Sequence, residues 1–162
     1  MTTYDVLDEA TIAATPAEIV QALVDEAAGR SQWWQPHLLM RQRGDRPPTE
    51  IGAVVDITVN SGGLAQRLAT VHFAGRVTAF EPERRLVLDY FDGDFRGTAE
   101  WTLSPVDGRR THIAVRWMTD PHGGMRLRAR FADVPGINSR VMQEGFRAIE
   151  RFAAGKRAEA PD

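Results

Sequence analysis

The stretch Ser139-Arg-Val-Met-Gln-Glu-Gly-Phe-Arg-Ala-Ile-Glu-Arg-Phe-Ala-Ala-Gly155 decides the fold, because it is typical of one amphipathic helix. Its apolar stripe consists of Met142, Gly145, Phe146, Ile149, Phe152 and Ala153. The opposite side carries Arg140, Glu144, Arg147, Glu150 and Arg151. Asn138 or Ser139 can cap the helix, and Gly155 is expected to end it. We therefore predict one domain over residues 1–155 and a disordered tail over residues 156–162.

Upstream of this helix, apolar residues alternate with polar ones, as they do in half-buried β-strands. In the clearest case Ala99, Trp101 and Leu103 share one face of a strand. The alternation predicts six strands, at residues 38–43, 53–60, 68–80, 85–91, 95–104 and 111–119. Turn-forming residues separate several of them, at positions 60–63, 81–83, 92–93 and 107–108. Such short connections predict an antiparallel meander.

The N-terminal part is expected to add one strand and two short helices. Residues 4–13 predict the strand. Thr15-Pro-Ala-Glu18 then combines a capping box with proline at the first helical position. Residues 31–36, SQWWQP, predict a second short helical turn that Pro36 ends. The order predicts an α+β fold in which a curved seven-stranded antiparallel sheet wraps around the C-terminal helix. Residues 120–136, broken by proline and glycine, remain open as a helical turn, a lid or a loop.

A helix laid across a bent sheet is expected to leave a hollow with apolar walls. We expect that hollow opposite the small residues Gly75, Gly97, Ala99 and Gly145. Large aromatic side chains are the predicted pocket wall, since each adds apolar surface and some add a hydrogen-bonding tip. They are Trp33, Trp34, Phe73, Tyr90, Trp101, Trp117, Phe131 and Phe146. Each of them could equally be plain core packing.

Composition excludes several classes of function. The chain has no cysteine, which rules out disulfides and thiolate chemistry, and its four histidines lack metal-ligand spacing. The formal net charge of −2 argues against nucleic-acid binding. No apolar run reaches the roughly 18 residues of a membrane span, so we expect a cytoplasmic protein without stable membrane insertion, either monomeric or homodimeric. We predict no metal and no cofactor. Residues 126–130, RLRAR, are either an anionic-lipid or phosphate contact or a solvated face.

Four stretches resemble the START/Bet v 1-like superfamily, in particular its polyketide cyclase/dehydrase and lipid-transport (SRPBCC) branch. They are residues 11–20 (TIAATPAEIV), 76–88 (RVTAFEPERRLVL), 98–115 (TAEWTLSPVDGRRTHIAV) and 145–152 (GFRAIERF). The resemblance implies a helix-grip fold with an internal cavity for a lipid, polyketide or aromatic metabolite. It implies no catalytic residue, since that superfamily has no universal one.

Three functions stay open at this point. The first is a binding or carrier protein for a hydrophobic small molecule. The second is a cyclase or dehydratase type of enzyme, which requires an acid or base inside the cavity, with His37, His72 and Glu100 as candidates. The third is a protein-interaction module with an exposed apolar patch around Trp33, Trp34 and residues 120–136.

Overall fold

The computed structural model describes residues 2–60 and 70–160. A strand and a helix come first, β1 (Tyr4–Ile12) and α1 (Pro16–Ala27). Six strands follow: β2 (Leu38–Arg43), β3 (Val54–Asn60), β4 (Thr70–Glu81), β5 (Arg85–Gly93), β6 (Phe95–Pro105) and β7 (Thr111–Pro121). The chain then forms α2 (Met125–Arg128), the 3₁₀ turn η2 (Ala129–Phe131) and the long helix α3 (Val134–Glu159). Residues 61–63 of one predicted turn and 68–69 of one predicted strand lie outside the described residues.

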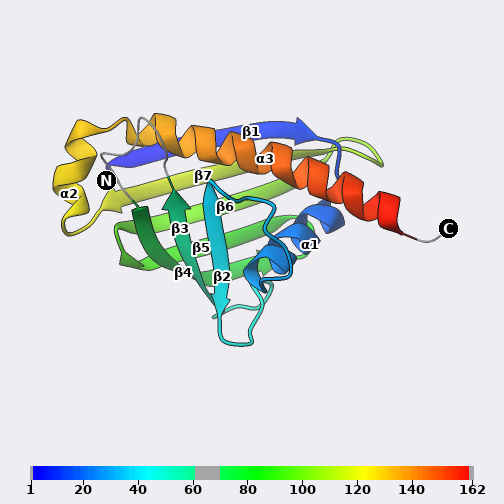
Figure 1. The fold of residues 1–162 in the computed structure, drawn as a ribbon, viewed down its shortest axis with the longest axis horizontal. Helices are drawn as coiled ribbons and strands as arrows, with labels where there is room; N and C mark the ends of the chain where they lie inside the picture. The colour runs from blue at the N-terminus through cyan, green and yellow to red at the C-terminus, as the bar shows by residue number, and fades with distance from the viewer. Residues whose placement is uncertain (1, 61–69, 161–162) are drawn as a thin grey trace.

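The strands form one antiparallel sheet in the order β1-β7-β6-β5-β4-β3-β2, which confirms the predicted α+β fold with a curved seven-stranded sheet. The sheet bends, and β2 and β3 run at a steep angle to β1, β6 and β7 (Figure 1). Two register shifts between β4 and β5, at Ala74/Gly75 and Val77/Ala79, mark where β4 turns. Such bulges bend the strand that carries them, so the sheet acquires a concave face.

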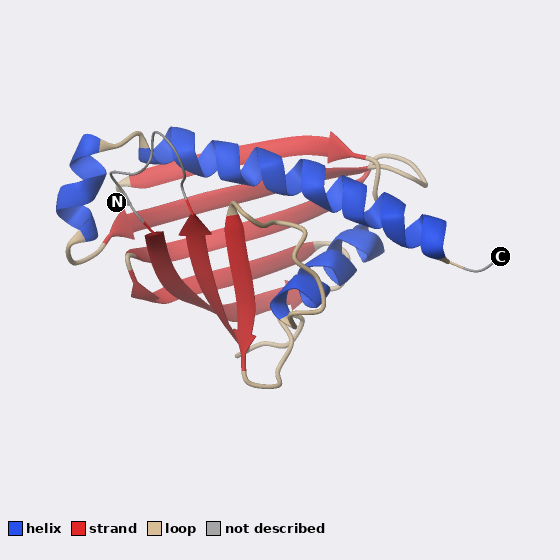
Figure 2. Ribbon diagram, viewed as in Figure 1, coloured by secondary structure: helices blue, strands red, loops and turns tan. Residues whose placement is uncertain are grey.

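Helices α1 and α3 both cover the concave face of the sheet (Figure 2). Strand alternation supplies the matching surface: Ala99, Trp101 and Leu103 are all buried, as predicted. From α3, Phe146 and Ile149 are almost completely buried against it. The long helix therefore closes the concave side along its length, and the core lies between these two layers.

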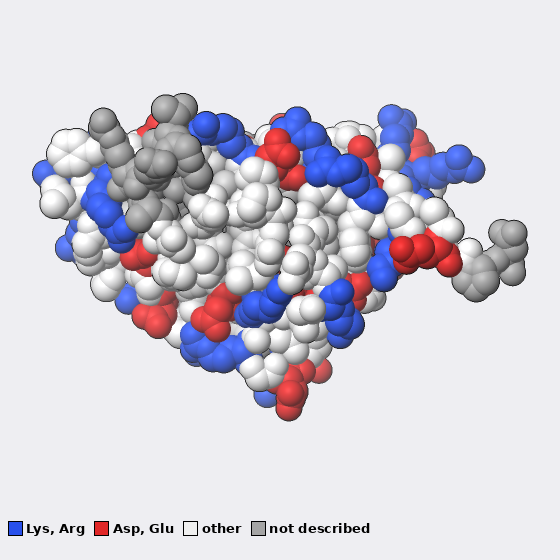
Figure 3. Space-filling model, viewed as in Figure 1, with Lys and Arg blue, Asp and Glu red and all other residues white. Residues whose placement is uncertain are grey.

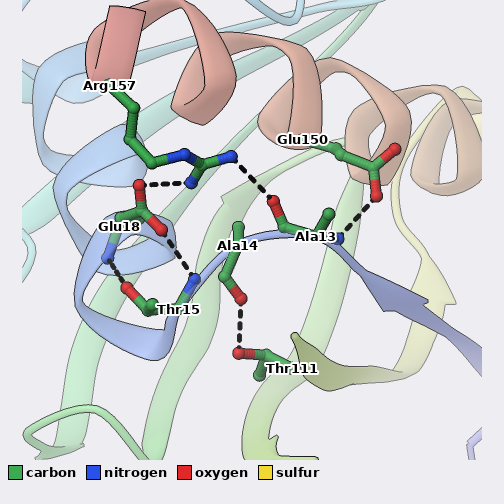
Figure 4. Close-up of polar contacts among 7 residues, drawn as sticks. All are labelled: Ala13, Ala14, Thr15, Glu18, Thr111, Glu150 and Arg157. Carbon is green, nitrogen blue, oxygen red and sulfur yellow. Dashed lines mark hydrogen bonds and ion pairs between the residues drawn. The ribbon is translucent and has the colours of Figure 1, made fainter. Parts of the chain in front are cut away.

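A polar junction ties the C-terminal part of α3 to the β1–α1 corner (Figure 4). Glu150 accepts a hydrogen bond from the Ala13 N–H at 2.6 Å, and Arg157 donates to Glu18 at 2.5 Å. Glu18 also completes the predicted capping box with Thr15. Although burial raises the pKa of Glu18, the hydrogen bonds from Thr15 and Arg157 lower it by more. These contacts hold the end of α3 in place.

Both predicted boundaries of α3 were wrong, and the junction explains the one at the C-terminal end. Gly155 does not end the helix, because Arg157, two residues later, is bonded to Glu18, and α3 continues to Glu159. Residues 156–159 of the predicted disordered tail are therefore helical. At the other end, Asp133 and not Asn138 is the cap, and it accepts a hydrogen bond from the Gly136 N–H.

The expected second short helix at residues 31–36 is also wrong, since this segment forms turns. The indole of Trp33 donates to the Ala22 carbonyl of α1 at 2.8 Å, and the indole of Trp34 donates to the Val141 carbonyl of α3 at 3.0 Å. Both bonds draw the segment toward the helices.

Candidate functional site: an apolar cavity under the long helix

A cavity of about 70 Å³ lies between the concave face and α3. Its wall is mostly apolar and comes from α1, the segment after it, the six strands β2–β7, the β2–β3 connection and α3. The lining residues are Leu23, Trp34, Leu38, Met40, Pro48, Val55, Ile57, Val59, Phe73, Leu86, Leu88, Tyr90, Trp101, Val115, Trp117, Asn138, Val141 and Met142. None of these side chains is charged. The cavity therefore favours an apolar and uncharged occupant.

Two smaller hollows lie beside this cavity. One of about 40 Å³ lies at the start of α3, near Val134 and Ile137, and shares Val59, Phe73, Trp117 and Asn138 with the cavity. The other, of about 20 Å³, lies toward α1 and shares Leu23, Pro48, Leu86 and Trp101. Since the hollows have walls in common, movement of the shared side chains would join them.

The indole of Trp34 fixes the wall on the α3 side. It stacks on Trp33 with 5.1 Å between ring centroids, and its edge faces Trp101 at 6.0 Å. A Cβ atom at Gly145 would lie 2.5 Å from the Trp34 ring, which is too close for any side chain. The sequence predicts a hollow opposite Gly145. Gly145 is instead the site where Trp34 packs on the helix.

Gly75 has a similar role on the sheet, because the ring of Tyr90 lies where its side chain would be. A Cβ atom at Gly75 would be 3.0 Å from that ring. Phe73 packs edge-on against the same ring, with 4.8 Å between centroids. Gly75 and Gly145, which the sequence predicts to face a hollow, thus receive aromatic rings, whereas Gly97 lies against the backbone of Met118 and Thr119. The cavity lies beyond the two rings.

Three side chains of the otherwise apolar wall, Tyr90, Trp117 and Asn138, carry polar groups. Burial raises the pKa of Tyr90, and a hydrogen bond with the Trp117 side chain only partly offsets this effect. Tyr90 therefore stays neutral and keeps its hydroxyl proton at physiological pH. Asn138 lines the cavity too, and its amide donates to the buried carboxylate of Asp8 at 3.3 Å. That bond leaves the other groups of the Asn138 amide for an occupant.

Comparison with solved structures gives the relatives of this architecture. Zhui aromatase/cyclase from Streptomyces sp. R1128 superposes with a TM-score of 0.69 at 15% identity, covering 97% of this chain and 96% of that one. A START superfamily protein from Mycobacterium smegmatis gives 0.64 at 16% identity, covering 93% and 97%. Ara h 8.0201 gives 0.57 at 16% identity, covering 94% and 98%. The chain has the START/Bet v 1-like helix-grip fold.

The resemblance first seen in sequence is thus confirmed at the level of the fold. No protein-family profile matches the chain, and no curated protein matches it at a significant level. Within the described residues, no helix combines the length and apolarity that crossing a membrane demands. At such low identity the START/Bet v 1-like fold does not by itself name a ligand or a reaction.

The predicted pocket residues divide into three groups in this helix-grip fold. Trp34, Phe73, Tyr90, Trp101 and Trp117 line the cavity. Phe146 packs edge-on against Trp101 from behind, and Trp33 packs on the outer side of Trp34. Phe131 does not belong to the pocket, because it lies 65% exposed after α2. Its position at a chain turn, outside the strand and helix periodicity, made its direction unreadable from sequence.

The three candidate catalytic residues all lie away from the cavity. His72 is on the outer face of β4, where its Nδ1 lies 3.1 Å from the Thr58 hydroxyl. Glu100 is on the outer face of β6 and accepts a hydrogen bond from Arg85 at 3.0 Å. His37 borders a separate surface groove of about 550 Å³ beside α3. No described group of three or more histidine, aspartate and glutamate side chains could hold a metal ion.

Sequence reasoning missed a buried carboxylate behind the cavity wall. Glu26 of α1 is fully buried, and neither of its carboxylate oxygens has a hydrogen-bond partner among the described residues. Burial raises the pKa of Glu26 to about 7, although the charge of Arg41 acts in the opposite direction. The Arg41 guanidinium is 3.9 Å from the carboxylate. The signal for this buried carboxylate that the sequence offered was the position of a glutamate on the inner side of α1.

Proposed function

We propose that this protein binds a small, mostly apolar and uncharged molecule in the cavity under α3. The observation that carries the proposal is the lining itself, which combines apolar walls with the polar tips of Tyr90, Trp117 and Asn138 and has no charged side chain. A few convergent polar groups in an apolar pocket fix the orientation of a bound molecule. The relatives with this fold include an aromatase/cyclase, which supports a ligand of the same broad kind.

The absence of charge in the lining narrows the ligand class. A carboxylate or phosphate placed there would lose its hydration without gaining a cation, which is costly. The Tyr90 hydroxyl, which accepts the hydrogen bond of the Trp117 indole, instead offers its own proton as a donor, which suits a carbonyl or hydroxyl oxygen. The proposed ligand is therefore a neutral molecule with one oxygen-bearing end, and a free fatty acid fits poorly.

The volume of the cavity limits the size of the ligand that it can hold without rearrangement. Pockets for drug-sized ligands typically measure about 300–1,000 Å³, whereas this cavity is about 70 Å³. A ligand of several rings or a long chain must therefore join the cavity to the two adjoining hollows. Trp101 and Trp117 are the largest side chains that the cavity shares with each neighbour, so their movement would open the most space.

The acid–base alternative receives less support from the same lining. That hypothesis requires a histidine, aspartate, glutamate or arginine facing the cavity, and none of the described lining residues is one of these. Tyr90 is the titratable group present, and its raised pKa makes it a hydrogen-bond donor and not a base. We therefore place binding ahead of catalysis.

Fluorescence titration with the neutral probe N-phenyl-1-naphthylamine tests the proposal. The wild-type protein should enhance and blue-shift the emission of the probe. Val115→Phe, which adds a ring inside the cavity, should weaken binding by at least about tenfold at a modest cost in stability. Ala114→Phe adds the same ring on the other face of β7 and is the matched control. Equal binding by the two variants would show that the probe does not occupy the cavity.

Tyr90→Phe separates the polar contact from the apolar wall. It keeps the ring and removes the hydroxyl, so a ligand with a carbonyl group should bind about three- to tenfold more weakly. The pure hydrocarbon naphthalene should bind the two proteins equally. A loss of affinity that is the same for both ligands would mean that the variant damages the wall and that the hydroxyl is not an anchor.

A further inference from the structure

The segment of residues 125–131, called here the α2 tip, carries a surface that the cavity does not use. It forms one end of the molecule, where α2 lies beyond the strands (Figure 1). Met125 and Ala129 point inward and are 0% and 6% exposed. Leu127 and Phe131 point outward and are 62% and 65% exposed. Two large apolar side chains therefore project into solvent one helical turn apart.

Basic side chains flank these two residues on the same tip. Arg126 and Arg130 are also one turn apart and exposed, and neither forms an ion pair within residues 2–60 and 70–160. Arg128 lies 3.6 Å from Asp94, which offsets part of its charge. Figure 3 shows basic atoms beside uncharged ones at the end of the molecule where α2 lies. The tip is thus both apolar and positively charged.

We propose that the α2 tip docks onto an anionic membrane surface. Exposed Leu and Phe side chains can enter the boundary between lipid head groups and acyl chains, and arginines beside them attract anionic head groups. The tip projects from one end of the molecule, and neither Leu127 nor Phe131 lines any of the hollows described above. A projecting tip suits a soft bilayer better than a rigid protein pocket.

The overall charge of the protein requires that contact with an anionic surface be made through a locally positive region. The formal net charge is −2, so the molecule as a whole is repelled by anionic lipid. Only a local excess of positive charge can then bring it to the surface. Docking in this orientation also places the 40 Å³ hollow at Val134 and Ile137 close to the bilayer, because α3 begins directly after the tip.

Vesicle flotation with the full chain and no added ligand tests this inference. One set of vesicles contains phosphatidylcholine alone, and the other contains about one third phosphatidylserine. The wild-type protein should float with the second set only, and less so as salt is raised, because salt screens the arginines. Equal binding to both sets, or to neither, would overturn the proposal.

Two double variants separate the contributions of charge and apolar contact. Arg126→Gln with Arg130→Gln should weaken binding by about fivefold per arginine removed. Leu127→Ser with Phe131→Ser should weaken it by at least about tenfold. The matched control replaces exposed residues elsewhere, Ile51→Ser with Arg109→Gln, and should bind like the wild type. A control that loses as much binding as the tip variants would also overturn the proposal.

Size-exclusion chromatography of the same variants tests whether the tip instead contacts a second copy of the chain. If the wild-type chain is a dimer and Leu127→Ser with Phe131→Ser is a monomer, the tip is a contact between two copies and the membrane proposal is wrong. An unchanged elution volume, together with lost flotation, supports membrane docking. Since no step requires an occupied cavity, this outcome is independent of the proposed ligand.

Discussion

The two halves of α3 are held in different ways. Residues 146–159 combine buried apolar packing with fixed polar anchors, since Glu150 and Arg157 bond to the β1–α1 corner. Residues 134–145 lie over the cavity and meet the rest of the protein through Trp34, Asn138 and a few aliphatic side chains. The first half of the helix forms part of the site, and the second half holds that part in position.

This difference explains how one helix can serve both a stable core and an adaptable cavity. The polar anchors at the C-terminal half fix the position and direction of the whole helix. The cavity half can then tolerate imperfect packing, because its loss of contacts is compensated elsewhere on the same element. If this interpretation is right, changes near Trp34 should alter the cavity, and changes near Arg157 should not.

The charge on Glu26, which lies on α1 behind the cavity wall, provides the largest expected effect on stability. Its carboxyl is next to the backbone of Trp33, which precedes Trp34, and burial raises its pKa from 4.5 to about 7. The folded state therefore binds the proton more tightly than the unfolded state. The stabilisation is complete below the unfolded pKa and is lost as the pH rises through the folded pKa, by roughly 3 kcal/mol between about pH 4.5 and pH 8.

Urea unfolding of wild type and Glu26→Gln at these two pH values measures this effect. The variant cannot lose a proton, so its stability relative to the wild type should rise by that amount toward high pH. Glu144→Gln, which removes an exposed carboxylate from α3, is the matched control and should keep the wild-type difference between the two pH values. Parallel curves for wild type and Glu26→Gln would show that the buried carboxyl does not titrate in this range.

Gly145→Ala tests the contact at the boundary between the two halves. The new methyl group would lie 2.5 Å from the Trp34 ring, which its bond to Val141 holds in place. Helix propensity favours alanine, but the overlap should destabilise the protein by about 1–3 kcal/mol and change affinity for the naphthylamine probe. Thermal unfolding and probe titration measure the two effects.

Gly155→Ala is the matched control in the other half of the helix. Nothing lies within 4 Å of a Cβ atom at Gly155, so alanine meets no obstacle there. The substitution should stabilise the protein by up to about 1 kcal/mol and leave probe binding unchanged. Similar destabilisation by the two alanines would contradict the role assigned to Trp34.

The fold could be predicted from sequence because each element has a strong local signal. The alternation around Trp101 and the stripe through Phe146 give directions that the structure confirms. The position of the hollow is predicted less well, since it depends on how side chains from elements distant in sequence pack against one another. Gly145 is small to admit Trp34, a residue 111 positions away whose indole bonds to the same helix. No local pattern carries that information.

The site was only half predictable for the same reason. Five of the predicted aromatic residues line the cavity, and strand alternation fixed the side of four of them, Phe73, Tyr90, Trp101 and Trp117. Phe131 and the turn at residues 31–36 lie outside regular elements, where periodicity gives no direction. The sequence predicts Asn138 only as a possible helix cap, whereas the helix begins one turn earlier and the Asn138 side chain reaches Asp8.

Arg157→Ala should have the smallest effect and should be confined to the anchored half. The lost bond to Glu18 is partly exposed, so the cost in stability should be about 1 kcal/mol or less. Hydrogen exchange should show faster exchange in the last turn of α3 and unchanged protection at residues 141–145. Arg151→Ala, at an exposed position on the same helix, is the control. Faster exchange that spread to residues 141–145, or altered probe affinity, would mean that the two halves respond together and that their separation into anchor and cavity wall is wrong.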